Sequence, residues 1–157
     1  MKLEDQVASV EQCKKLKELG VDQCGCFSWL YSPFNSNYDI SHQNVESLEL
    51  LAKSNPKSIE WKERIEKGIF SAFTVSELGL MLPDLLVNNH LQYELVCVKE
   101  DDCWLCRYVR DNNILAVHPN VIGYAAEAEA TCRAGILIHL IEKQIVSISE
   151  INKKLSC

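Results

Sequence analysis

Apolar residues recur every three to four positions along residues 10–20, which is the spacing of an amphipathic helix. The apolar positions on this face are Val10, Cys13 and Leu16. Ser9 and Gln12 stand three residues apart, as in a capping box, where each side chain accepts a hydrogen bond from the other residue's backbone N–H. Gly20 is suited to the left-handed conformation that ends many helices. The pattern predicts a helix between Ser9 and Gly20.

The next segment has the pattern of a β-hairpin. Residues 26–31, CFSWLY, are rich in the aromatic side chains that favour strands. Residues 32–37, SPFNSN, are mostly turn formers, and residues 38–40, YDI, are suited to return as the second strand. This segment therefore predicts two antiparallel strands joined by a short loop.

Residues 36–68 carry a weaker apolar pattern. A helix is predicted over residues 43–53, with one apolar stripe consisting of Val45, Leu48, Leu51 and Ala52. A second helix is predicted to end at Gly68, with Ile59 and Ile65 directed inward. Because these helices carry little apolar surface, residues 36–68 are interpreted as either a helical or a mobile insertion.

The signal is stronger after residue 71. Thr74 and Glu77 have the spacing of a second capping box, so a helix is predicted to begin there. Its apolar face consists of Val75, Leu78, Met81, Leu82 and Leu85. Pro83 has no backbone N–H to donate, so the helix is expected to kink or restart at that residue.

The last third of the chain predicts strands and then helices. Residues 92–114 are interpreted as two strands around the acidic turn EDD, and residues 114–118 as a third short strand. Residues 124–146 predict a long helix, alanine-rich at first and then strongly apolar, with Glu127 and Glu129 in its first turns, where the helix dipole favours acidic residues. A final short helix is predicted to end at Leu155.

This order of elements predicts an α+β fold, in which helices pack on an antiparallel sheet built from hairpins. The 157 residues, 47% of them hydrophobic and 24% charged, suit a single domain spanning residues 1–157 with one core. The apolar C-terminal helix is expected either to be buried within the monomer or to pair across a homo-oligomer.

Composition and charge narrow the classes of function. The net charge of −6 argues against general nucleic-acid binding, which needs clustered Lys and Arg. The most basic run, CKKLK, is flanked by Glu11 and Glu18. No apolar run is long enough for a signal sequence or a membrane span, so we expect a cytoplasmic protein whose eight cysteines are mostly reduced.

Three blocks resemble a known family. They are residues 9–31 (SVEQCKKLKELGVDQCGCFSWLY), 71–83 (SAFTVSELGLMLP) and 127–146 (EAEATCRAGILIHLIEKQIV). In this order they are similar to a widespread family of small, uncharacterised phage and prophage proteins. The chain departs from the family at residues 132–135, where an arginine-alanine-lysine pattern is usual, and residues 36–68 match nothing in it. The resemblance implies a phage or prophage setting, and the family has no established catalytic residues that could be carried over to this chain.

In residues 100–106, EDDCWLC, the spacing of Cys103 and Cys106 is that of one half of a structural zinc site. Structural zinc takes four ligands, and the partners available are Cys24 and Cys26, whose Cys-x-Cys spacing is poorer than Cys-x-x-Cys. If residues 103–110 form a strand, positions three apart project to opposite faces. A module held together by structural zinc is therefore only a third hypothesis, ranked below the two binding functions described below. We predict no metal or cofactor.

Other catalytic chemistry is poorly supported. Three acidic residues precede Cys103, and their negative charges are expected to disfavour the thiolate that a redox pair needs. The chain has no glycine-rich phosphate loop, no His-x-x-x-His pair and no histidine in a nucleophile motif. We therefore predict that the protein is not an enzyme.

The aromatic strands supply the predicted binding residues. Trp29 and Tyr31 share one face of the first predicted strand, and Trp104 and Tyr108 share a face of a later one. Arg110 lies on the same face as Trp104 and would supply a positive charge. Aromatic side chains on such a strand face either pack in the protein core or form an exposed platform on which a ligand or partner side chain can stack.

Two functional hypotheses follow. In the first, the protein is a phage accessory protein that binds a host or defence protein through its acidic surface and its aromatic strands. In the second, it binds or sequesters a small nucleotide-like ligand by aromatic stacking and Arg110. A deep aromatic-lined pocket would favour a small ligand, and a flat apolar patch would favour a protein partner.

Overall fold

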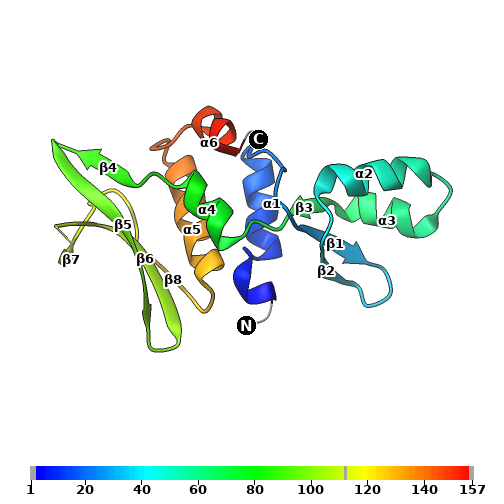
Figure 1. Cartoon of the computed structure of the whole chain (residues 1–157), viewed down its shortest axis with the longest axis horizontal. Coiled ribbons are helices and arrows are strands. Elements are labelled where there is room, and N and C mark those ends of the chain that lie inside the picture. Colours follow the sequence, from blue (N-terminus) through cyan, green and yellow to red (C-terminus); the bar gives the residue numbers. More distant parts are fainter. Residues whose placement is uncertain (1–2, 112, 156–157) are drawn as a thin grey trace.

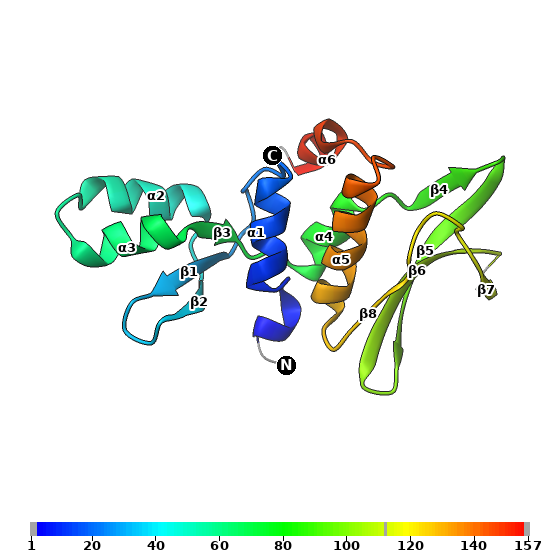
Figure 2. The ribbon, with the colours of Figure 1, turned by 180° about the vertical axis from the view of Figure 1, so that it is seen from behind.

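The computed structural model describes residues 3–111 and 113–155, and it has the predicted α+β architecture. A central group of helices lies between two antiparallel sheets, so that the molecule is elongated (Figures 1 and 2). The helices are η1 (Leu3–Gln6), α1 (Val10–Glu18), α2 (Val45–Ser54), α3 (Ile59–Lys67), α4 (Val75–Met81), α5 (Glu129–Glu142) and α6 (Ile148–Leu155). The strands are β1 (Ser28–Ser32), β2 (Asn37–Ser41), β3 (Ile69–Ser71), β4 (Leu85–Asn88), β5 (Leu91–Glu100), β6 (Cys103–Arg110), β7 (Asn113–Val117) and β8 (Tyr124–Ala126).

The first sheet has the strand order β2-β1-β3 and separates two cores. Trp29 in β1 is buried in the main core, together with residues of α1 and α5. The neighbouring Leu30 packs against a smaller cluster beneath α2 and α3, made of Val45, Leu48 and Ile69. The alternation of side chains along β1 thus connects the helical pair α2–α3 to the rest of the molecule.

The second sheet has the order β4-β5-β6-β7, and β8 also pairs with β6. Strands β5 and β6 form a long hairpin around Asp101 and Asp102, as the sequence predicts. Helix α5 lies against the inner face of this sheet (Figure 1), and Leu137 and Leu140 on this helix are completely buried. The apolar side chains of α5 are therefore used within the monomer.

Side-chain caps begin helices α1 and α4. In α1 the Ser9 hydroxyl accepts from the Gln12 N–H, and in α4 the Thr74 hydroxyl accepts from the Glu77 N–H. Both capping boxes are confirmed. Residues 45–67, within the segment interpreted as an insertion, form the α2–α3 pair.

Several predictions of local structure were wrong. Ile59 and Ile65 are exposed, because α3 packs inward through Trp61. Residues 124–126 are a strand and not the start of α5, because they pair with residues 104–106 of β6. Backbone pairing at that edge outweighs the helix propensity of the alanines. Leu85 lies in β4 and is exposed, since the preceding helix ends at Met81.

The sequence predicted neither β3, β4 nor β8, and it predicted one sheet where the structure has two. Each of these three strands has only three or four residues, too few to show a periodic pattern. Among the described residues, the structure contains no helix that is both long and apolar enough to cross a membrane.

Candidate functional site

A cavity of about 470 Å³ opens beside the β5–β6 hairpin, at the start of α5. It is lined from η1, from the first turn of α4, from both strands of the hairpin and from the residues that lead into α5. The lining residues are Asp5, Gln6, Thr74, Val75, Ser76, Lys99, Trp104, Glu127, Ala128 and Glu129. This volume is within the range of small-ligand sites, and we refer to it as the Trp104 cavity.

Trp104 is held in place by strands on both sides. It lies opposite Lys99 of β5 and opposite Ala126 of β8. Its carbonyl oxygen accepts a hydrogen bond from the Cys132 thiol at 3.4 Å, which connects the strand to α5. The half-buried indole therefore forms a fixed aromatic wall of the cavity, with the Lys99 side chain beside it on the same face of the sheet.

The charges of the cavity are mainly negative. Among the described residues, three carboxylates line it, from Asp5, Glu127 and Glu129, together with the ammonium group of Lys99. Glu129 is already paired, since Arg133 Nε donates to its Oε1 at 2.8 Å. Asp5 and Glu127 are exposed to solvent at the rim. A positively charged group that enters the cavity would therefore meet carboxylates and an aromatic ring together.

The start of α5 adds a weaker positive element. Ala128 is the N-cap of α5, and no side chain caps the first N–H groups of this helix. These N–H groups carry the positive end of the helix dipole. By contrast, α4 begins with a capping box where it borders the cavity: the Thr74 hydroxyl accepts from the Glu77 N–H, and Glu77 Oε2 accepts from the Thr74 N–H at 2.7 Å.

The structure places the other four predicted binding residues away from the cavity lining. Tyr108 is 1% exposed, so it offers no open platform, although Trp104 on the same face of β6 lines the cavity. Trp29 and Tyr31 are buried in the other sheet. Arg110 forms an ion pair with Asp111 at the opposite end of β6 from the hairpin turn. The structure therefore does not bring these five residues into one site.

The cysteines proposed for zinc are also separated. Cys103 is exposed whereas Cys106 is buried, as expected for two residues three apart in a strand. Cys24 and Cys26 precede β1, and the Cys24 thiol donates to the Leu155 carbonyl. Among the described residues, no group of three or more His, Cys, Asp or Glu side chains is arranged to hold a metal ion.

Sequence reasoning missed Lys99, Asp5 and Glu127 as residues of the site. Lys99 was within reach of prediction, because a two-residue turn at Asp101 and Asp102 fixes the register that places it opposite Trp104. Asp5 and Glu127 are distant in sequence, and no local pattern connects them.

Comparison with models of protein families, with curated proteins and with solved structures gives no match to this chain.

Proposed function

We propose that this protein is a non-enzymatic binding protein that holds a basic segment of a partner protein in the Trp104 cavity. The observation that carries the proposal is the combination of a tryptophan wall with two exposed carboxylates, Asp5 and Glu127, around a cavity of about 470 Å³. In this proposal a Lys or Arg side chain of the partner enters over the indole, and the carboxylates face its charge.

The physical terms favour a cationic group. A cation over a tryptophan face contributes about 0.5–2 kcal/mol, depending on how far the site is desolvated. The net charge of −6 adds long-range attraction for a basic partner, which accelerates association and weakens with salt. The partner that we propose is a host or defence protein, in keeping with the resemblance to phage proteins.

A second candidate is a small nucleotide-like ligand. The start of α5 and Lys99 would face its phosphate, while Trp104 would stack on its base. The three carboxylates of the cavity oppose an anion, so this candidate ranks second.

Titration calorimetry with short peptides distinguishes the two candidates. A peptide with two adjacent arginines should bind, whereas the same peptide with citrulline at these positions should bind at least about tenfold more weakly, because citrulline has a similar shape but no charge. In thermal denaturation, a panel of nucleotides should not raise the melting temperature of the protein.

Variants then assign the binding to the cavity. Asp5→Asn and Glu127→Gln should each weaken binding of the arginine peptide about three- to tenfold. Glu66→Gln, which removes a charge from exposed α3, is the matched control and should leave the affinity unchanged. Equal binding of the citrulline peptide would overturn the proposal, and a nucleotide that stabilises the protein would favour the second candidate.

A further inference from the structure

Three cysteines from distant parts of the chain meet between the second sheet and α5. Cys97 in β5 lies directly opposite Cys106 in β6, and the nearby Cys132 and Cys97 thiols both raise the pKa of Cys106. The Cys132 thiol in α5 has two backbone acceptors for its single proton, the Tyr124 carbonyl at 2.7 Å and the Trp104 carbonyl at 3.4 Å. All three are free thiols. Cys97 and Cys106 are nine positions apart in one hairpin, whereas Cys132 is 26 positions beyond Cys106 and joins them only through the packing of α5 on the sheet.

The register of the hairpin makes the Cys97–Cys106 pair suitable for a disulfide. Glu100 and Cys103 flank the two-residue turn, and such a pair is hydrogen-bonded to each other through the backbone. Along the hairpin, hydrogen-bonded and non-hydrogen-bonded residue pairs alternate, so Cys97 and Cys106 form a non-hydrogen-bonded pair. The Cα atoms of such a pair are typically about 4.5 Å apart. This separation lies within the range that disulfides span.

Cys97 is also the member of the group that a small oxidant reaches. It is half-buried and lines an open cavity of about 500 Å³, which it shares with Arg133. Cys106 and Cys132 are buried. The hydrogen bond from Cys106 lowers the pKa of the Cys97 thiol, and the Arg133 guanidinium lowers it further, although burial opposes both effects. Asp84 and Glu94 also line this cavity, and their charges favour a neutral oxidant over an anionic one.

We propose that Cys97 and Cys106 are a peroxide-responsive thiol pair, in which a hydroperoxide oxidises Cys97 and Cys106 then closes a disulfide between β5 and β6. In the first step the Cys97 thiolate attacks one peroxide oxygen. An S–O bond forms, the O–O bond breaks, and the leaving oxygen takes up a proton, which leaves Cys97 as a sulfenic acid. In the second step the Cys106 sulfur attacks Cys97. An S–S bond forms, the S–O bond breaks, and the hydroxide leaves as water with the Cys106 proton. Two thiols supply the two electrons that reduce one hydrogen peroxide to two water molecules.

The test is peptide mass mapping of the full chain after brief exposure to hydrogen peroxide, without any binding partner. The expected product is a Cys97–Cys106 disulfide that dithiothreitol reverses. In Cys106→Ser the sulfenic acid should persist on Cys97 and react with dimedone, at least about tenfold faster than exposed Cys103 does. Cys103→Ser and Cys132→Ser should both retain the disulfide.

Two results would overturn the proposal. One is a wild-type protein in which Cys97 is oxidised no faster than Cys103. The other is a bridge from Cys97 to Cys132, which would make Cys106 a bystander. Mapping of the wild-type protein needs no substitution at a buried site, so a misfolded variant does not affect the outcome. Because no ligand is involved, the result is independent of the function proposed for the Trp104 cavity.

Discussion

The ring of Tyr124 lies directly against the backbone of Gly135. Tyr124 belongs to the short strand β8, and Gly135 lies in the middle of α5. A Cβ added at Gly135 would be 2.6 Å from Cζ of the ring and closer still to Cδ1 and Cε1. The absence of a side chain at this position is thus what lets Tyr124 and β8 approach the helix.

We expect Gly135→Ala to lower the free energy of unfolding by about 1 kcal/mol. Displacing the Tyr124 ring costs about 1–3 kcal/mol, and the better helix propensity of alanine returns about 1 kcal/mol. Gly79→Ala in α4 is the matched control, because its Cβ would meet only the flexible end of Arg133, at 3.3 Å. Urea unfolding should show Gly79→Ala neutral or stabilised, and a stabilised Gly135→Ala would refute this packing.

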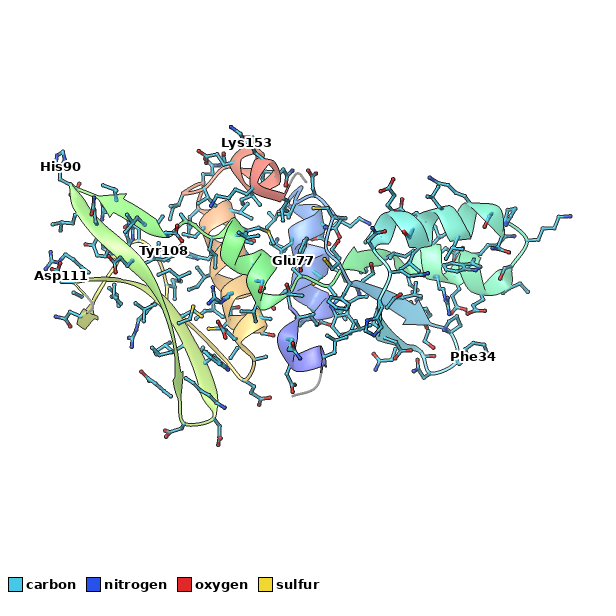
Figure 3. The ribbon with its side chains drawn as sticks, in the orientation of Figure 1. Phe34, Glu77, His90, Tyr108, Asp111 and Lys153 are labelled. Atoms are coloured by element: carbon cyan, nitrogen blue, oxygen red, sulfur yellow. The ribbon has the colours of Figure 1, made fainter. Side chains whose placement is uncertain are left out.

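Removing the Tyr108 hydroxyl should destabilise the protein by about 1–2 kcal/mol. This hydroxyl donates to the Pro83 carbonyl at 2.6 Å, in the segment that connects α4 to β4 (Figure 3). In Tyr108→Phe the carbonyl loses this donor. The control is Tyr124→Phe, whose ring is 41% exposed and whose hydroxyl loss should change the denaturation midpoint little.

Glu77 connects the start of α4 to the segment before β1. Its Oε2 accepts from the Thr74 N–H and hydroxyl, and its Oε1 accepts from the Cys26 N–H at 2.9 Å. Figure 3 shows Glu77 among the central helices. We expect Glu77→Ala to cost about 1–2 kcal/mol in thermal or chemical unfolding, since it removes the carboxylate half of the capping box and the hydrogen bond from the Cys26 N–H. Glu66→Ala on exposed α3 should cost little, and equal losses in the two variants would contradict this role.

His118 should make the protein less stable in mild acid. Its side chain is 5% exposed, it packs on Tyr93, and its Nδ1 accepts from the Asn120 N–H at 3.2 Å. Burial lowers the pKa of His118 in the folded state. In the unfolded chain the His118 imidazole has a pKa of about 6.5, so as the pH falls the unfolded chain takes up a proton there before the folded protein does. The free energy of unfolding should therefore fall as the pH drops from about 6.5 toward the folded pKa of His118.

Denaturation at pH 7 and at pH 5.5 measures this effect. His118→Asn retains an acceptor near the Asn120 N–H and should flatten the pH dependence. His90→Asn is the control, because His90 is exposed at the tip of the β4–β5 hairpin (Figure 3), in a left-handed conformation that asparagine tolerates. An unchanged slope in His118→Asn would show that another group titrates.

Local signals were sufficient for much of the fold. Ser9 with Gln12 and Thr74 with Glu77 mark helix starts from four consecutive residues, and the structure has both capping boxes. The acidic turn before Cys103 likewise fixed the β5–β6 hairpin. Prediction failed where pairing with a distant segment decides the conformation, as at Tyr124, whose alanine-rich surroundings favour a helix but whose backbone pairs with Cys106.

The candidate sites could not be predicted from the expected fold alone. The shared face of Trp104 and Tyr108 follows from strand periodicity, but which face the helices cover depends on how α5 packs, so the exposure of these rings was not predictable. The Trp104 cavity and the group of Cys97, Cys106 and Cys132 combine residues from η1, β5, β6 and α5, which lie far apart in the sequence.

The amino-acid sequence by itself determined the capped starts of α1 and α4, the β1–β2 and β5–β6 hairpins, and the opposite orientations of Cys103 and Cys106, because neighbouring residues control backbone geometry and caps. Only the tertiary structure decided that β8 joins β6, that Tyr124 covers Gly135, and that Cys132 of α5 joins the Cys97–Cys106 pair. These contacts connect residues far apart in the chain, and their stability comes from shared burial, which no single segment encodes.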